Sequence, residues 1–179
     1  IKDKIVLVSG AGGSIGSELC RQLARFGVSQ LTIVDHAEYN LYAIDKELSA
    51  SGTLVKSLLG NVTNKAHLYH VFKQTKPDVV FHAAAYKHVP IVEKNAVVGM
   101  SNNVLGTHTL AVAAAEAQVE RFILISSDKA VRPTNMMGAS KRLAEVVVQD
   151  LATRTRNGTL FSMVRFGNVM GSSGSVIPL

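Results

Sequence analysis

The sequence predicts an α/β fold in which helices cover both faces of a doubly wound parallel sheet. Short apolar runs rich in β-branched residues alternate with longer segments of helical period. Six such runs occur, and the segments between them are long enough for crossover helices. The first run also ends in a cluster of glycines directly before a helical segment. These features together are typical of a parallel sheet buried between two helical layers.

The N-terminal half is predicted to contain three strands. The first, "KIVLVSG" (Lys4–Gly10), is apolar on both faces, as a strand between two helical layers should be. The helix that follows ends at Gly27, a usual residue after a helix C-terminus. Its predicted buried face consists of Ile15, Leu19, Leu23 and Phe26. The second and third strands are "LTIVD" and "TLVKSLLG", with a polar helical segment between them.

The C-terminal half supplies three further strands. Pro77 introduces the fourth, "DVVFHAAA", and an alanine-rich helix over about Val104–Ala117 leads to the fifth, "RFILISS". The sixth is "LFSMVRFGN". The helix before it is predicted to bury Leu143, Val147 and Leu151 and to stop at Asn157 and Gly158. No linker or repeat interrupts the pattern, so residues 1–179 are predicted to form one domain with a loop-like end, "GSSGSVIPL".

Composition excludes several classes of protein. The chain has 179 residues, 47% of them hydrophobic, which is enough for one well-buried core. Its net charge of +6 is spread along the chain without a basic run, so nucleic acid is not an expected partner. The single Cys20 excludes an internal disulfide and fits a reducing compartment. No apolar run approaches the ~20 residues that span a bilayer, so we expect a cytoplasmic segment without membrane contact of its own.

The glycine cluster, "SGAGGSIG", has the spacing of a phosphate-binding loop. Gly10 permits the tight turn, Gly13 lets the backbone approach a pyrophosphate, and Gly16 allows the helix to pack closely on the strand. Ser14 and Ile15 lie at the helix N-terminus, where backbone N–H groups attract an anion. The strand–turn–helix context makes this a Rossmann-type dinucleotide site rather than a plain turn.

Two further positions are predicted to hold the adenosine half of a dinucleotide. Asp35 ends the second strand 19 residues after Gly16, where an acid can bind both ribose hydroxyls. Such an acid favours NAD over NADP, whose 2′-phosphate would face the negative charge; the alternative is that Asp35 only caps the next turn. Asn61, followed by Val62, either hydrogen-bonds the adenine edge or serves as a turn asparagine.

The carboxyl ends of the last three strands are the expected place for chemistry, since ligands of open α/β sheets bind there. The fourth strand ends with Ala83, Ala84 and Ala85, which should line the cofactor site. The fifth is followed by Ser127, Asp128 and Lys129, which set an acid beside a base. Such a pair can donate and accept protons, or it can be a surface ion pair.

Lys141 lies on the next helix, one turn after Met137 and on the same face. A lysine there can hold the nicotinamide ribose or can be a solvated helix residue. One large class of dehydrogenases carries a tyrosine at the position of Met137, but methionine has no proton to transfer. The six histidines have no spacing typical of a metal site, so no metal is expected.

Longer motifs carry a family resemblance over essentially the whole chain. The motifs are "VSGAGGSIGSELCRQL", "DHAEYNLYAIDKEL", "PDVVFHAAAYKHVP", "NNVLGTHTLA", "ISSDKAVRPTNMMGASKRLAE" and "RFGNVMGSSGSVIPL". Together they resemble the polysaccharide-biosynthesis (capsular polysaccharide) branch of the extended short-chain dehydrogenases. Within this branch the sequence is most similar to UDP-N-acetylglucosamine 4,6-dehydratases. Methionine in place of the tyrosine is a mark of that branch.

The resemblance implies a reaction on a UDP-sugar with bound NAD: oxidation at C4, loss of water across C5 and C6, and reduction at C6. It implies that Asp128 protonates the departing C6 hydroxyl and that Lys129 removes the C5 proton. Ser127 would hydrogen-bond the C4 oxygen, and Lys141 would assist oxidation and hold the cofactor ribose. Asn103 and Asn168 match positions that line the family's pocket, and Lys87 matches a position near the cofactor and substrate.

Some implications concern the protein as a whole. Family members continue beyond "SGSVIPL" with a segment that closes over the sugar, and many have N-terminal membrane spans, so the chain is expected to be the cofactor-binding core of a longer protein. A homo-oligomer is expected from the fold. Asn61 stands where the family usually has aspartate, and its amide oxygen can still accept a hydrogen bond from adenine. The alternatives are a UDP-hexose 4-epimerase and a non-catalytic module that binds NAD or a nucleotide sugar.

Overall fold

A six-stranded parallel sheet in the order β3-β2-β1-β4-β5-β6 forms the centre of the molecule. The computed structural model describes residues 1–155 and 158–171. The strands are β1 (Ile5–Ser9), β2 (Gln30–Asp35), β3 (Val55–Leu59), β4 (Val79–His82), β5 (Arg121–Ile125) and β6 (Leu160–Val164). This order confirms the predicted doubly wound α/β fold, a Rossmann-type sheet with helices on both faces.

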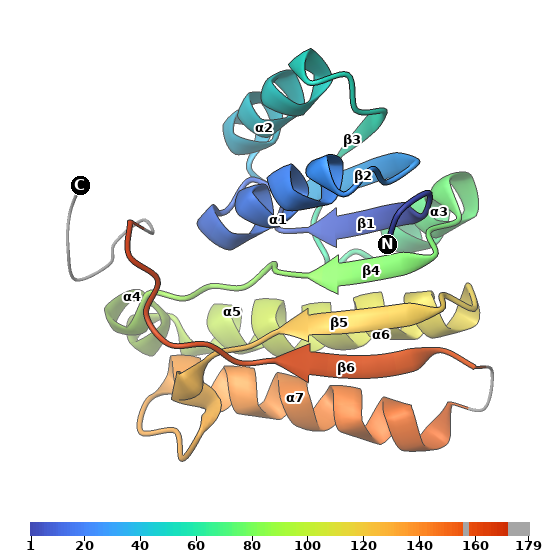
Figure 1. Cartoon of the computed structure of the whole chain (residues 1–179). Helices are drawn as coiled ribbons and strands as arrows, with labels where there is room; N and C mark the ends of the chain where they lie inside the picture. The colour runs from blue at the N-terminus through green and yellow to red at the C-terminus, as the bar shows by residue number, and fades with distance from the viewer. Residues whose placement is uncertain (156–157, 172–179) are drawn as a thin grey trace.

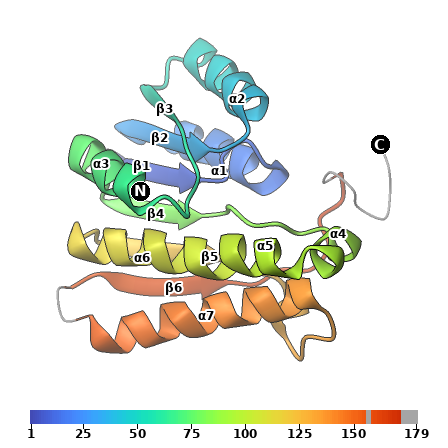
Figure 2. The same ribbon diagram turned by 180° about the vertical axis from the view of Figure 1, so that it is seen from behind.

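Helices lie on both sides of the sheet. They are α1 (Ser14–Arg25), α2 (Glu38–Ala50), α3 (Lys65–Thr75), α4 (Val89–Lys94), α5 (Ala96–Met100), the π-helical η1 (Ser101–Leu105), α6 (Gly106–Glu116), the 3₁₀ turn η2 (Asp128–Ala130) and α7 (Met136–Arg154). α1 and α2 lie on the side of the sheet that faces the viewer in Figure 1. The view from behind shows α3, α6 and α7 across the opposite face (Figure 2).

Two separate hydrophobic cores follow from this layering, because successive side chains of a strand point to opposite faces. Val6 and Val8 of β1 pack with Cys20 and Leu23 of α1. Leu7, between them in sequence, belongs to the other core, which α3, α6 and α7 complete. The uniformly apolar pattern of β1 is therefore explained by burial on both sides.

The sheet reverses its strand order between β1 and β4, which are neighbours although two strands separate them in sequence. All strands run in the same direction, so their carboxyl ends meet at one edge (Figure 1). Loops leaving β1 and β4 must diverge there, one toward α1 and the other toward α4. This divergence opens a crevice at the edge where the candidate residues lie.

The faces of two helices differ from the prediction. In α1 the buried residues are Gly16, Cys20 and Leu23, whereas Phe26 follows the helix and is exposed. In α7 Leu143 is exposed. The residues buried instead are Met137, Gly138, Ser140, Lys141, Ala144, Glu145 and Val148. The hydrophobic pattern was misleading because polar and small side chains occupy these buried positions.

Several predicted boundaries also shift. β4 and β6 end earlier than expected, at His82 and Val164, and their chains continue without regular strand structure. The predicted alanine-rich helix begins with a π-helical turn, and the short helices α4 and α5 were not predicted. The predicted stop at Asn157 and most of the loop-like end (172–179) lie outside the described residues. α7 itself ends at Arg154.

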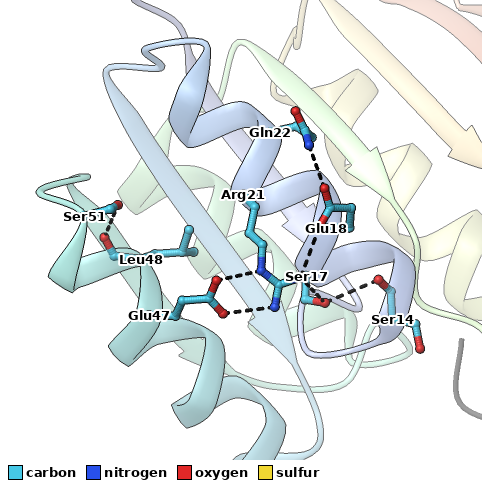
Figure 3. A network of polar contacts seen from close by, with 8 residues as sticks. All are labelled: Ser14, Ser17, Glu18, Arg21, Gln22, Glu47, Leu48 and Ser51. Atoms are coloured by element: carbon cyan, nitrogen blue, oxygen red, sulfur yellow. Dashed lines mark hydrogen bonds and ion pairs between the residues drawn. The ribbon is translucent and has the colours of Figure 1, made fainter. Parts of the chain in front are cut away.

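A polar network joins α1 to α2 on the outer side of the fold (Figure 3). Arg21 of α1 donates from Nε and Nη2 to the two carboxylate oxygens of Glu47 in α2, over 2.7 and 3.0 Å. Glu18 accepts a further bond from Arg21 and one from Gln22. The network connects the helix that follows the glycine loop with the helix that follows Asp35.

None of the helices within residues 1–155 and 158–171 combines the length and the apolar character that crossing a membrane requires.

Candidate active site

Two cavities lie side by side along the carboxyl edge of the sheet. The first, of about 250 Å³, is bounded by the loops after β1, β2 and β3. The second, of about 400 Å³, lies among the segments after β4, β5 and β6 and the start of α7. Ala83, Ala85 and Tyr86 line both, whereas Ala84 lines only the first. The segment after β4 therefore forms the wall that the two cavities share.

The glycine loop requires its glycines for space and for backbone conformation. Gly10 has φ +70°, and a Cβ there would lie 2.5 Å from the backbone nitrogen of Ala84. A Cβ on Gly16 would collide with the carbonyl of Gly10. Gly13 is the N-cap of α1 and lines the first cavity, and Ile15 lines the second. The loop thus brings bare backbone to the junction of the cavities, which suits a pyrophosphate.

Asp35 closes the far end of the first cavity. Its carboxylate accepts 2.9 Å hydrogen bonds from the backbone N–H groups of Gly12 and Ala37. The turn-capping role considered from the sequence is therefore present, and the residue also lines the cavity. No lysine or arginine is found among the described residues lining this cavity. A ligand with hydroxyl donors suits this carboxylate better than one with an added phosphate.

Asn61 and Val62 border the same cavity. Oδ1 of Asn61 accepts 2.9 Å hydrogen bonds from both the N–H and the hydroxyl of Thr63. These bonds are those of a turn asparagine, and they occupy the oxygen that was expected to accept from adenine. The backbone N–H of Thr63 also fixes which end of the amide carries the oxygen.

Ser127, Asp128 and Lys129 form a connected group at the mouth of the second cavity. Oδ1 of Asp128 accepts from the Ser127 hydroxyl at 3.0 Å and from Nζ of Lys129 at 3.2 Å. These contacts, the Ser127 bond first, hold the pKa of the Asp128 carboxyl below its usual value. Ser127 and Lys129 line the cavity. The ion pair considered from the sequence therefore exists; its lysine lines the cavity, whereas Asp128 is exposed beside it.

Met137 and Lys141 form part of the wall opposite, from the first turns of α7. Lys141 is buried, and its Nζ donates to the carbonyl of Ile125 over 2.7 Å. Burial lowers the pKa of the Lys141 ammonium to about 8, although nearby Glu145 acts in the opposite direction. Lys141 is thus not the solvated helix lysine considered as an alternative. Met137 contributes an apolar surface that cannot transfer a proton.

The three residues taken from the family pattern have different surroundings. Asn168 lines the second cavity and accepts from Nζ of Lys129 over 2.9 Å, and exposed Lys87 lines the same cavity. Asn103, expected to line the pocket, is only 1% exposed. It bonds both the N–H and the carbonyl of Tyr86 and the Ser140 hydroxyl. Asn103 therefore lies behind the cavity wall and supports it.

A buried histidine extends this support. Thr107 donates its hydroxyl proton to the carbonyl of Asn103, so its oxygen must accept from Nε2 of His82. Nδ1 of His82 then accepts from the Ser9 hydroxyl over 2.7 Å. Burial, and to a smaller extent Lys141, lowers the pKa of His82 to about 3, so the ring is neutral. β1, β4 and α6 are joined by this chain directly behind the site.

Several site residues were not anticipated from the sequence. Tyr86, His88 and Asn102 line the cavities, and His36 lies edge-on to Tyr86 at 6.1 Å between ring centroids. Tyr86 and His88 flank Lys87 in a stretch already noticed, so the position after β4 was a usable signal. Among the described residues, no group of three or more His, Cys, Asp or Glu is arranged to hold a metal ion.

Comparison with known proteins identifies the family. The family described as "Polysaccharide biosynthesis protein" matches residues 6–179. The chain belongs to this family. A relative, the capsular polysaccharide biosynthesis protein CapD of Staphylococcus aureus, is 47% identical over all of this chain and 30% of its own length. A UDP-glucose 4-epimerase of Rickettsia canadensis is 35% identical over 99% of this chain and 52% of its own.

Solved structures share the fold of this chain. Pen from Bacillus thuringiensis superposes with a TM-score of 0.92 at 33% identity, covering 98% of this chain and 55% of its own. DesIV, a dTDP-glucose 4,6-dehydratase from Streptomyces venezuelae solved with NAD and TYD, has a TM-score of 0.78 at 23% identity over 89% and 54% of the two chains. The present chain spans about half or less of the length of the proteins it matches.

Proposed function

We propose that this chain is the core of a nucleotide-sugar 4,6-dehydratase that converts UDP-N-acetylglucosamine to a 4-keto-6-deoxy sugar for surface polysaccharide synthesis. The observation that carries the proposal is the Asp128–Lys129 pair at the second cavity. The amine of Lys129 lines this cavity together with Met137, which cannot transfer a proton, and the Asp128 carboxyl lies 3.2 Å from that amine. Elimination of water needs an acid and a base together, whereas simple oxidation does not.

The first cavity and the glycine loop suit the cofactor. Gly10, Gly13 and the N-terminus of α1, with Ser14 and Ile15, would hold the pyrophosphate of NAD, and Asp35 its adenosine ribose. Ala83, Ala84 and Ala85 leave room for the rings along the shared wall. Bound NAD would supply the oxidant for C4 and the reductant for C6. The solved dehydratase DesIV holds NAD in the same fold, which supports this assignment.

The protein's own residues then carry the proton transfers. Lys141 assists loss of the C4 hydroxyl proton, and the Ser127 hydroxyl bonds the resulting C4 oxygen. The ion pair first transfers a proton from Nζ of Lys129 to Oδ1 of Asp128. The neutral Lys129 amine then takes the proton from C5, which the 4-keto group makes acidic, and Asp128 gives its proton to the C6 hydroxyl, which leaves as water. Elimination leaves Lys129 as the ammonium and Asp128 as the carboxylate, so the pair is restored. The proton that Lys141 took from the C4 hydroxyl supplies the one that C5 needs when C6 is reduced, so protons balance.

The nucleotide end of the substrate needs cations and polar groups. Lys87 and His88 lie at the mouth of the second cavity and, together with Asn168, would bind the UDP part. An anionic diphosphate suits this arrangement, since lysine is an effective partner for phosphate oxygens.

The reaction can be tested by incubating UDP-N-acetylglucosamine with the complete protein and identifying the product by mass spectrometry and NMR. We expect a UDP-linked 4-keto-6-deoxy sugar without net formation of reduced cofactor. Asp128→Asn and Lys129→Ala should each lower dehydration at least a hundredfold, in line with the usual contribution of general acid–base groups. Both should bind NAD as the wild type does, because neither residue lies at the glycine loop.

A UDP-hexose 4-epimerase is the second candidate, favoured by the 35% identical relatives named UDP-glucose 4-epimerase. An epimerase of this fold uses a tyrosine before the lysine, and Met137 argues against it. A product inverted only at C4 would support the epimerase and overturn the dehydratase. Full activity in both the Asp128 and Lys129 variants would remove the roles given to them. Binding of NAD without any turnover would favour a non-catalytic module.

A further inference from the structure

Glu145 is a charged residue with no exposed side-chain surface, and none of the roles above uses it. Its carboxylate accepts from the Ser126 hydroxyl at 2.6 Å and from Nε and Nη2 of Arg165 at 2.7 and 2.6 Å. Arg142 of the same helix donates a fourth bond of 3.0 Å. These four hydrogen bonds compensate for the loss of hydration, because burying a carboxylate without such donors is strongly unfavourable.

The donors come from the segments that carry the proposed catalytic groups. Ser126 directly follows β5 and precedes Ser127, and Arg165 directly follows β6, three residues before Asn168. Glu145 is on α7, one turn after Lys141. Figure 1 shows β5, β6 and α7 side by side where these segments leave the sheet. One carboxylate therefore joins three of the elements around the second cavity: β5, β6 and α7.

Beyond this carboxylate, the chains after β5 and β6 continue together. The N–H of Ser126 donates to the carbonyl of Val164 over 2.8 Å, and the N–H of Asp128 donates to the carbonyl of Phe166 over 3.0 Å. Farther out, Lys129 reaches Asn168. This pairing continues past the regular end of the sheet, and the acid–base pair lies on it. Its inner end is held by Glu145.

The charge of Glu145 persists in its buried place. Burial alone would raise its pKa, but hydrogen bonds from Arg165, Ser126 and Arg142 outweigh burial and lower the pKa to about 2. The bidentate contact with Arg165 adds direction as well as attraction, because a guanidinium meets both carboxylate oxygens in one plane. Glu145 does not line either cavity among the described residues, so it acts through its partners.

We propose that Glu145 is a positioning residue, whose bonds to Ser126 and Arg165 hold Asp128 and Lys129 in register with Lys141 across the second cavity. This inference rests on the proposed function, which assigns the proton transfers to those residues. Elimination requires the acid and the base to meet C6 and C5 while C4 faces Lys141. Small displacements of such groups are costly in rate.

The test is Glu145→Gln in the complete protein, because glutamine keeps the size and one acceptor but loses the charge and the bidentate contact. We expect kcat for dehydration to fall at least tenfold, with KM for the UDP-sugar and Kd for NAD within twofold of wild type. Asp150→Asn, which breaks the exposed pair with Arg154 on the same helix, is the control and should keep kcat within twofold. An unchanged kcat in Glu145→Gln would overturn the proposal.

Hydrogen exchange provides a second measurement that does not depend on turnover. In Glu145→Gln the amides of Ser126 and Asp128 should exchange at least tenfold faster, while those of β1 keep their wild-type rates. Arg165→Lys keeps the positive charge but loses the bidentate contact, so the same amides should exchange at rates between those of wild type and Glu145→Gln. This variant replaces Glu145→Gln in the test if Glu145→Gln does not fold. Equal amide exchange rates in wild type and all variants would contradict the positioning role of Glu145. If wild type forms no keto sugar, the proposed function fails, and exchange still decides the role of Glu145.

Discussion

Lys141 carries a primary amine and is only 7% exposed, a combination that is rare in proteins. The charged form loses hydration in the wall of the second cavity, which explains its lowered pKa. The carboxylate of Glu145 on the same helix partly compensates for this loss, and the buried ring of His82 on β4 is neutral. An amine that titrates near neutrality can exchange protons with substrate, so the burial that destabilises the fold is useful for the proposed oxidation at C4.

This burial predicts a pH-dependent effect of Lys141→Met on stability. The unfolded pKa is 10.5 and the folded pKa is about 8, so the unfolded state binds more protons between these values. The cost of burying the charge is therefore fully present below pH 8 and disappears as the pH rises to 10.5. A shift of this size corresponds to on the order of 3 kcal/mol.

Urea unfolding of wild type and Lys141→Met at several pH values measures this effect. Relative to wild type, the variant should lose stability steadily from pH 8 to 10.5, whatever the fixed cost of leaving the Ile125 carbonyl without its donor. Taking the difference between the two proteins cancels other groups, such as the buried thiol of Cys20. A difference that does not vary with pH would show that Lys141 keeps an ordinary pKa.

Asn103 offers a second prediction for a single residue. Its side-chain amide accepts a hydrogen bond from the backbone N–H of Tyr86 and donates one to the backbone carbonyl of Tyr86, as a neighbouring strand would do. Asn103→Ala should lower the free energy of unfolding by about 2 to 4 kcal/mol, because it leaves partly buried backbone groups without partners. Asn95→Ala removes an amide of an exposed residue and is the control, with an expected cost under about 0.5 kcal/mol. Similar losses in both variants would contradict the supporting role.

Among the elements, α1 and α2 start at the two ends of the first cavity and are joined on the outside by Arg21 and Glu47 (Figure 3). Both side chains are partly exposed, so the pair should contribute modestly. Its bidentate geometry places the expected coupling near the upper part of the range for surface pairs, roughly 0.5 to 1 kcal/mol. The contact limits how far the glycine loop and Asp35 can separate.

A double-mutant cycle with Arg21→Ala and Glu47→Ala measures this coupling. The coupling free energy should decrease when salt is added, because exposed charges are screened. The ion pair of Asp150 and Arg154 within α7, for which one contact between Nε and Oδ1 is found, is the comparison. Its expected coupling is about 0.3 to 0.5 kcal/mol. A coupling for Arg21 and Glu47 no larger than this would mean that the bidentate geometry adds nothing between the helices.

The elements also show which features a sequence can reveal. β1 and the glycine loop were predictable because burial on both faces and a tight turn each require particular residue types. The buried face of α7 was not predictable, because three of its residues are polar types usually found at the surface. Each is buried with a partner: Lys141 with Ile125, Ser140 with Asn103, and Glu145 with Arg165. Those partners are distant in sequence. For the same reason, Asn103 was expected in the pocket although it lies behind the wall.

At the scale of the whole molecule, the two cavities form a continuous row across the reversal point of the sheet. A dinucleotide that follows this row contacts the loops after β1, β2 and β3 with one half and the segments around Lys141 with the other. Binding of such a ligand to the folded state alone raises the apparent stability according to its concentration and affinity. Thermal unfolding therefore reports on the ligand preference of the entire edge.

NAD should raise the melting temperature more than NADP at equal concentration. The 2′-phosphate of NADP would lie near the Asp35 carboxylate, and no described lysine or arginine lines that cavity to offset the repulsion. We expect at least tenfold weaker binding of NADP, equivalent to about 1.4 kcal/mol. Asp35→Asn should weaken the binding of NAD and reduce the difference between the affinities for NAD and NADP. Glu38→Gln removes a neighbouring exposed acid that does not line the cavity and should preserve the preference. Equal shifts with both cofactors in wild type would contradict the role of Asp35.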